Sequence, residues 1–179
     1  MSEKRFLIVV DMQNDFIDGS LGTKEAQAIV SAAVERIRAC RAAGCNVILT
    51  MDTHEENYLE TREGKYLPVR HCIRGTVGWQ IRPEVLEAAG ESAVLVEKPT
   101  FGSVRLPQII RERVASGDSV AVELIGLCTD ICVVSNALLL KAHFPEAEFA
   151  VRADCCAGVT PEKHLAALET MRSCQIAIE

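Results

Sequence analysis

Cys132 is the residue of this sequence that most readily suggests chemistry, and it lies in a short polar turn with a second cysteine, Cys128. An apolar, β-branched run at Val120–Ile125 precedes the turn, and a long apolar segment with helical spacing follows it. The pattern predicts a strand, a tight turn and a helix, with Thr129 and Asp130 where helix caps usually lie. A cysteine in the first turn of a helix meets unpaired backbone N–H groups and the positive end of the helix dipole, so it ionises more easily. The simpler interpretation of such a thiol is a small buried hydrophobic side chain.

Other reactive side chains follow the predicted strands that precede this turn. Asp11 ends the first strand, and Asp52 ends the second. His54 comes two residues after Asp52, and Lys98 follows the third strand. Each of them taken alone could be a turn residue, a cap or a solvated charge. Because ligands bind beyond the carboxyl ends of parallel strands, we expect them to gather with Cys132 at one edge of a sheet.

A cysteine hydrolase mechanism follows from this set. A thiol attacks a carbonyl only as the thiolate, so it needs a base, and Asp11 offers one in apolar surroundings. A carboxylate there tends toward a raised pKa, and the Lys98 ammonium would oppose that rise and stabilise the thiolate. Backbone N–H groups around Cys128 and Cys132 could hold the developing oxyanion. The rival arrangement uses a histidine as base, and the candidates are His54, His71, His143 and His164.

Asp52 and His54 also predict a metal site. They are two residues apart at the extended end of a strand, so their side chains face the same way. Oxygen and nitrogen ligands from this pair, with His71 from the following loop, suit a divalent metal, with zinc first and manganese or iron(II) as alternatives. Glu63 is the candidate for the fourth ligand. Three carboxylates near it in the sequence compete for that place: Glu55, Glu56 and Glu60.

The elements that must position these residues alternate between strands and helices. Short apolar runs predict strands at 5–10, 45–51, 93–96, 120–125, 148–151 and 174–178. Helical spacing predicts helices at 24–43, 82–89, 106–115, from 129 or 130 onward, and 160–173. The polar stretch 52–81 has no convincing periodicity and is interpreted as a functional loop. This alternation predicts an α/β fold, namely a three-layer α/β/α sandwich with a mostly parallel five- or six-stranded sheet.

Composition narrows the class of protein. A chain of 179 residues with 49% hydrophobic content fits one compact domain spanning 1–179. The net charge of -6 is spread without basic blocks, which argues against a nucleic-acid or membrane partner. The apolar run Phe6–Val10 is too short for a signal peptide or a spanning helix. Eight cysteines without a C-x-x-C pair then predict reduced thiols in the cytoplasm.

These residues stand in stretches that resemble the isochorismatase-like cysteine hydrolase superfamily, and within it the nicotinamidases. The matching stretches cover nearly the whole chain in the right order: LIVVDMQNDFIDGSL, TMDTHEEN, RHCIRGTVGW, EKPTFGS, ELIGLCTDICVVSNAL and RADCCAGVTPEKHLAALETM. The resemblance implies a catalytic triad at Asp11, Lys98 and Cys132. It also implies a non-proline cis peptide bond between Leu127 and Cys128, the oxyanion-hole residue.

The family's metal site falls on Asp52, His54 and His71. Some members complete it with a glutamate between the two histidines, which supports Glu63. Members commonly self-associate, so the resemblance also implies a homo-oligomer.

The resemblance also bears on the substrate. Isochorismatases hydrolyse an enol ether and lack the cysteine, so Cys132 favours a small amide. In nicotinamidases the metal holds the pyridine nitrogen and aromatic side chains pack the ring, and Phe16 and Phe101 match such positions. The sequence departs from the common pattern in YLPVRH, which has no tryptophan before His71, and at Cys128, where alanine is more usual.

The hypothesis is a cysteine amidohydrolase that converts nicotinamide to nicotinate and ammonia through a thioester. One alternative is a related hydrolase acting on another small amide or ureide. An alternative of another class is a non-catalytic binding or redox-sensing protein that uses Cys128 and Cys132 as a thiol pair. His164 is expected to be a surface or interface residue rather than a catalyst.

Overall fold

A parallel sheet forms the centre of the molecule in the computed structural model, which describes residues 2–179. Within these residues six strands pair in the order β3-β2-β1-β4-β5-β6, and each neighbouring pair is parallel. The strands are β1 (Glu3–Val10), β2 (Asn46–Asp52), β3 (Val94–Lys98), β4 (Ser119–Leu127), β5 (Glu148–Ala157) and β6 (Ala177–Ile178). The strand pairing confirms the predicted sheet.

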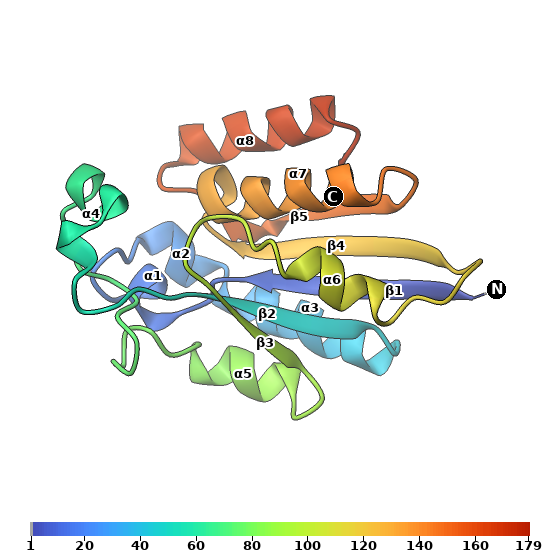
Figure 1. The fold of residues 1–179 in the computed structure, drawn as a ribbon, viewed down its shortest axis with the longest axis horizontal. Coiled ribbons are helices and arrows are strands. Elements are labelled where there is room, and N and C mark those ends of the chain that lie inside the picture. Colours follow the sequence, from blue (N-terminus) through green and yellow to red (C-terminus); the bar gives the residue numbers. More distant parts are fainter. Residues whose placement is uncertain (1) are drawn as a thin grey trace.

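Helices cover both faces of this sheet (Figure 1). The helices on one face are α2 (Lys24–Ala28), α3 (Val30–Ala42) and α5 (Pro83–Ala89). Those on the other face are α6 (Leu106–Arg111), α7 (Val134–His143) and α8 (Pro161–Ser173). The three-layer α/β/α sandwich is therefore confirmed. Among residues 2–179, no helix has both the length and the apolar character needed to cross a membrane.

The central strand β1 shows why the layers form. Its residues Phe6–Val10 are all buried. Leu7 and Val9 join the core under α3 and α5, whereas Ile8 and Val10 join the core under α6, α7 and α8. Successive side chains of a strand point to opposite faces, so a strand covered on both sides needs an unbroken apolar run.

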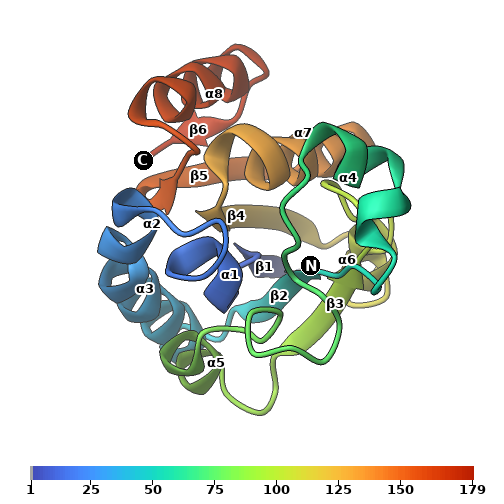
Figure 2. The ribbon, with the colours of Figure 1, turned by 90° about the vertical axis from the view of Figure 1, so that its left-hand side faces the viewer.

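The carboxyl ends of the strands face the viewer in Figure 2, together with the short helices that surround them. These helices are α1 (Asn14–Ile17), the 3-10 turn Tyr58–Glu60 and α4 (Arg62–Tyr66). Asp11, Asp52 and Lys98 stand at the ends of β1, β2 and β3, as predicted. The turn with Cys132 follows the end of β4, so the chain delivers all four residues to one edge.

Several element boundaries differ from those that the sequence predicts. The helix expected at 24–43 is two helices that meet at Ile29, and the helix expected at 106–115 ends at Arg111. The stretch 52–81, interpreted as a loop, contains the 3-10 turn and α4. Helices of three to five residues are too short to display a 3.6-residue period, so their pattern is invisible in the sequence.

Strand β5 also runs further than predicted, to Ala157 instead of residue 151. Its pairing with β4 changes register between Leu124 and Gly126, and it then continues to Leu127. Gly126 has φ +115, and a Cβ there would lie 2.1 Å from the Val10 carbonyl oxygen. Only glycine therefore fits the point where β4 approaches β1 and turns toward the site.

Gly126→Ala should lower the free energy of unfolding by roughly 3 kcal/mol, because it adds both backbone strain and overlap with Val10. Gly44→Ala is the matched control, since Gly44 has φ +75 with nothing within 4 Å of the added Cβ. The control should lose only the conformational part, about 1 kcal/mol. Urea denaturation measures both variants, and equal losses would contradict the close approach at Gly126.

Candidate active site

Cys132 lies in a single turn of π-helix, Thr129–Val133, that connects β4 to α7. The turn follows a cis peptide bond between Leu127 and Cys128, which the sequence resemblance implies. Backbone N–H groups of Ile131 and Val133 both donate to the Cys128 carbonyl oxygen, at 3.0 and 3.1 Å. The Cys132 side chain is buried, so the turn presents this thiol to the interior of the site.

Thr129 and Asp130 do not cap this helix, which corrects the expectation from the sequence. In the described chain no side chain caps the turn, and the N-cap position is Cys128. Thr129 Oγ1 instead lies 2.8 Å from His164 Nδ1, and Asp130 Oδ1 accepts the Val159 N–H at 2.9 Å. Both bonds tie the turn to the start of α8. His164, expected on the surface or at an interface, is therefore half-buried against the turn.

The ammonium of Lys98 contacts both other residues of the predicted triad, Asp11 and Cys132. Its Nζ lies 2.6 Å from Asp11 Oδ2 and donates to Cys132 Sγ at 3.4 Å. It also donates to the Thr100 carbonyl oxygen at 3.1 Å and lies 3.4 Å from Asp52 Oδ1. The Asp11 and Lys98 side chains are fully buried. The structure thus brings together the three residues that the sequence predicts.

Asp11 is held in place by Thr50 on the neighbouring strand. The Thr50 hydroxyl donates to Asp11 Oδ1 at 2.6 Å, and it accepts the Asp11 backbone N–H at 3.2 Å. Asp11 has φ +47, a conformation that costs free energy for a residue with a Cβ. The bonds from Thr50 therefore fix both the backbone and the carboxylate of Asp11.

The pKa of the Cys132 thiol is shifted in the direction opposite to the one expected at a helix N-terminus. Burial and the negative charge of Asp11 raise the pKa of the Cys132 thiol well above its ordinary value, although Lys98 opposes them. The resting thiol is therefore protonated, and the predicted easier ionisation is wrong for this resting state. Burial also raises the pKa of Asp11, which makes its carboxylate a stronger base.

Lys98 stays charged in this buried place. Burial alone would lower the pKa of Lys98, but the negative charge of Asp11 first, and that of Asp52, raise the pKa above its ordinary value, as does a thiolate at Cys132 whenever one forms. The site therefore carries a permanent positive charge beside a proton donor and a proton acceptor.

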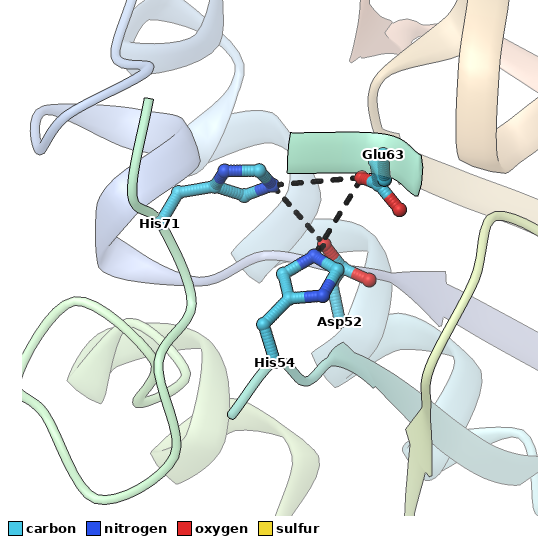
Figure 3. Close-up of side chains that lie close together, drawn as sticks. All are labelled: Asp52, His54, Glu63 and His71. Atoms are coloured by element: carbon cyan, nitrogen blue, oxygen red, sulfur yellow. Dashed lines mark hydrogen bonds and ion pairs between the residues drawn. The ribbon is translucent and has the colours of Figure 1, made fainter. Parts of the chain in front are cut away.

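Asp52, His54, Glu63 and His71 form a second cluster next to this group (Figure 3). Their ligand atoms all lie within 4.8 Å of one another. His54 Nε2 lies 3.0 Å from Asp52 Oδ2 and 3.6 Å from Glu63 Oε1. His71 Nε2 lies 3.5 and 3.9 Å from the same two oxygens. Four ligand atoms from the end of β2, the segment that follows it, α4 and the loop after α4 therefore converge on one point.

The surroundings of this cluster fit a divalent metal. His71 Nδ1 donates to the Val69 carbonyl oxygen at 2.8 Å, so Nε2, which faces the carboxylates, is the ring nitrogen that would bind a metal. Burial would raise the pKa of Asp52, but the hydrogen bonds of His54 and His71 and the charge of Lys98 lower it, so the carboxylate is ionised. Two imidazoles with two carboxylates suit zinc, manganese or iron(II).

The competing carboxylates point elsewhere. Glu55 and Glu56 pair with Arg74 and Arg70, respectively, and Glu60 is exposed. Among these four acids, Glu63 alone belongs to the cluster. Its position at the start of α4 explains this choice, because the short helix turns it back toward β2 (Figure 3).

A pocket of about 290 Å³ connects the two clusters. Its polar wall contains Asp52, Glu63, His71, Cys128 and Cys132. Its apolar wall contains the predicted Phe16 and Phe101, together with side chains that the sequence did not indicate: Leu21, Leu67, Leu127, Ile131 and Val159. Trp79 does not line this pocket, and its Nε1 donates to Thr53 Oγ1. The pocket is therefore large enough for a small molecule and combines polar and apolar side chains.

Three buried polar residues that support the site were not indicated by the sequence: Gln13, which bonds the backbone of Asp52, and two others. One of those two is Thr50, beside Asp11. The other is Asn136, whose Nδ2 donates to the carbonyl oxygens of Cys132 at 2.8 Å and Phe101 at 3.1 Å. Thr50 and Asn136 both interrupt apolar runs, which is the signal that could have found them, because a polar group in a core needs a partner.

Comparison with known proteins decides the family. The family model described as "Isochorismatase domain" matches residues 5–178. The chain belongs to the isochorismatase family. This family member is 27% identical to the nicotinamidase/pyrazinamidase of Mycobacterium tuberculosis over 97% of both chains.

Two solved structures are similar to this chain over nearly its whole length. The pyrazinamidase of Pyrococcus horikoshii in complex with zinc is 31% identical, with a TM-score of 0.84 over 98% of both chains. The N-carbamoylsarcosine amidase from Thermoplasma acidophilum is 27% identical, with a TM-score of 0.80 over 98% of this chain and 95% of that one. The similarity therefore spans the sheet and the site together.

Thr50→Val should lower the free energy of unfolding by roughly 1–3 kcal/mol at neutral pH, because a buried carboxylate oxygen of Asp11 loses its donor. Thr50→Ser is the matched control, since serine keeps the hydroxyl. Urea denaturation measures both variants. A valine variant as stable as the serine variant would show that the Thr50 hydroxyl does not support Asp11.

Proposed function

We propose that this isochorismatase-family protein is a metal-assisted cysteine amidohydrolase that converts nicotinamide to nicotinate and ammonia. The observation that carries the proposal is the position of Lys98 Nζ, 2.6 Å from Asp11 and 3.4 Å from Cys132, beside a pocket that three of the four candidate metal ligands line. A nucleophile, a base and a cation are thus in contact where a small amide could enter.

The first half of the reaction forms a thioester. The Asp11 carboxylate takes the thiol proton of Cys132 as the sulfur attacks the amide carbon. Backbone N–H groups of the turn that contains Cys128 and Cys132 hold the oxyanion of the tetrahedral intermediate. Asp11 then gives its proton to the leaving nitrogen, and the carbon–nitrogen bond breaks to release ammonia.

The second half regenerates the thiol. Asp11 takes a proton from water, the resulting hydroxide adds to the thioester carbon, and the carbon–sulfur bond breaks. Asp11 returns the proton to the Cys132 sulfur, and the carboxylic acid that is formed loses its own proton to water as it leaves as nicotinate. Lys98 remains an ammonium throughout and stabilises the thiolate whenever it forms, which offsets the raised pKa of the resting thiol.

Asp52, His54, Glu63 and His71 would hold the metal, and a bound divalent ion supplies a Lewis acid that can orient the substrate's ring nitrogen. Zinc is proposed first because the similar Pyrococcus horikoshii protein is described in complex with zinc. Phe16 and Phe101 would pack the ring in the apolar part of the pocket. These contacts point the carboxamide toward Cys132.

The chain is further proposed to act as one hydrolase domain over 1–179, as a homo-oligomer, in cytoplasmic nicotinamide salvage. A second candidate is hydrolysis of another small amide or ureide, which the similarity to N-carbamoylsarcosine amidase supports. Leu67 lines the pocket and belongs to the stretch YLPVRH, where the sequence departs from the common nicotinamidase pattern, and this departure also supports the second candidate.

Ammonia release from nicotinamide tests the proposal. The reduced wild-type protein should release ammonia, and Cys132→Ala should reduce the rate by at least about 10³-fold, because the nucleophile is lost. Cys174→Ala is the matched control, since Cys174 is an exposed thiol and its removal should leave the rate unchanged. Turnover by Cys132→Ala at the wild-type rate would overturn the mechanism.

The same assay, run after chelation and with both kinds of substrate, tests the need for a metal and separates the two candidate functions. Chelated protein should lose nicotinamide hydrolysis and regain it with zinc or manganese. If every metal-loaded form ignores nicotinamide but hydrolyses a carbamoyl amino acid, the second candidate replaces the first.

A further inference from the structure

Asp15 takes no part in the chemistry described above, yet it lies next to the chain segment that follows His71, one of the candidate metal ligands. It belongs to the first turn of α1, and it is neither a candidate ligand nor a lining residue of the pocket. Its carboxylate faces the chain that follows His71. A charged group in such a place requires partners, and the structure provides them from the backbone.

The partners of Asp15 come chiefly from the segment 72–78. Asp15 Oδ2 accepts the Cys72 N–H at 2.8 Å, and the Asp15 N–H donates to the Gly78 carbonyl oxygen at 2.9 Å. A Cβ on Gly78 would lie 2.2 Å from Asp15 Oδ2. The segment therefore passes so close to Asp15 that a side chain at residue 78 would displace the Asp15 carboxylate. Asp15 Oδ1 also accepts the Ser20 N–H at 3.3 Å, within its own loop.

Cys72 connects this contact to two of the metal-ligand candidates. It follows His71 directly, it is fully buried, and it has φ +47, which is unfavourable for a residue with a Cβ. Its N–H donates to Asp15, and its carbonyl oxygen accepts the His54 N–H at 3.0 Å. One left-handed residue thus links α1, His71 and His54.

We propose that Asp15 is a positioning residue for the metal site. Its hydrogen bond to the Cys72 N–H stabilises the left-handed turn at Cys72, and that turn sets His71 against His54 and Asp52. Without the bond, Cys72 relaxes toward negative φ and carries His71 away from the other ligands. This inference rests on the metal site of the proposed function.

The metal affinity of the protein tests this role without reference to activity. The probe is zinc chloride in competition with a fluorescent chelator, on metal-free protein whose fold is checked by circular dichroism. Asp15→Ala should bind zinc about 10- to 100-fold more weakly than wild type, the range found when groups that orient metal ligands are removed. Asp18→Ala, in the same short segment but paired with Arg82, is the matched control and should stay near wild type.

Two further variants separate positioning from loss of charge or loss of fold. Gly78→Ala keeps the Asp15 charge but displaces the carboxylate, so it should also weaken zinc binding. Adding Cys72→Gly to Asp15→Ala should restore part of the affinity, because glycine adopts positive φ without the hydrogen bond.

Equal zinc affinity in wild type, Asp15→Ala and Gly78→Ala would overturn the positioning role and leave the proposed function intact. A weakened Asp15→Ala variant that Cys72→Gly does not improve would also overturn it, because the effect would not pass through the turn at Cys72. Absence of zinc and manganese binding in wild type would overturn the metal part of the proposed function together with this inference.

Discussion

The buried ammonium of Lys98 is the interaction on which the rest of the site depends. A cation without solvent is very costly unless anions and carbonyl groups surround it, and here Asp11, Asp52 and the Thr100 carbonyl oxygen do so. The same charge is what makes a thiolate at Cys132 attainable. Burial raises the pKa of the Cys132 thiol, so a neighbour that stays positive has to lower the free energy of the ionised form during reaction. In the proposed mechanism, this arrangement keeps Cys132 as a neutral thiol at rest and stabilises its thiolate when a substrate carbonyl is present.

Lys98 also connects the reacting group to the metal-binding cluster, because Asp52 contacts the ammonium through Oδ1 and the two imidazoles through Oδ2. The parallel sheet makes this connection: β1, β2 and β3 are neighbours, and Asp11, Asp52 and Lys98 stand at their carboxyl ends. Around this edge, backbone segments far apart in the sequence are held by buried side chains. Gln13 shows the pattern, since its amide bonds both the N–H and the carbonyl oxygen of Asp52 and also reaches the Trp79 carbonyl oxygen.

Much of this arrangement follows from the sequence, because strand ends in an alternating chain converge on one edge. That rule placed Asp11, Asp52, Lys98 and the Cys132 turn together, and residue spacing with family resemblance indicated Glu63 and His71. The sequence pattern could not show the short helix α4, because five residues are too few to display a helical period. It also could not show the partners of Thr129 and Asp130, since a polar residue after a strand suits a cap equally well until α8 is seen to pack there. The thiol's raised pKa was missed for a similar reason: burial depth is a property of the whole fold, not of the turn.

The most direct test of the central claim is rapid-quench mass spectrometry of the metal-loaded protein during its first turnover of nicotinamide, with hydroxylamine in parallel reactions. If Cys132 is the nucleophile, an acyl group appears on the peptide that contains it, and a hydroxamate forms when hydroxylamine intercepts the thioester. Release of ammonia with no acyl group on Cys132 and no hydroxamate would contradict the account, because the amide bond would then be broken without this thiol as nucleophile.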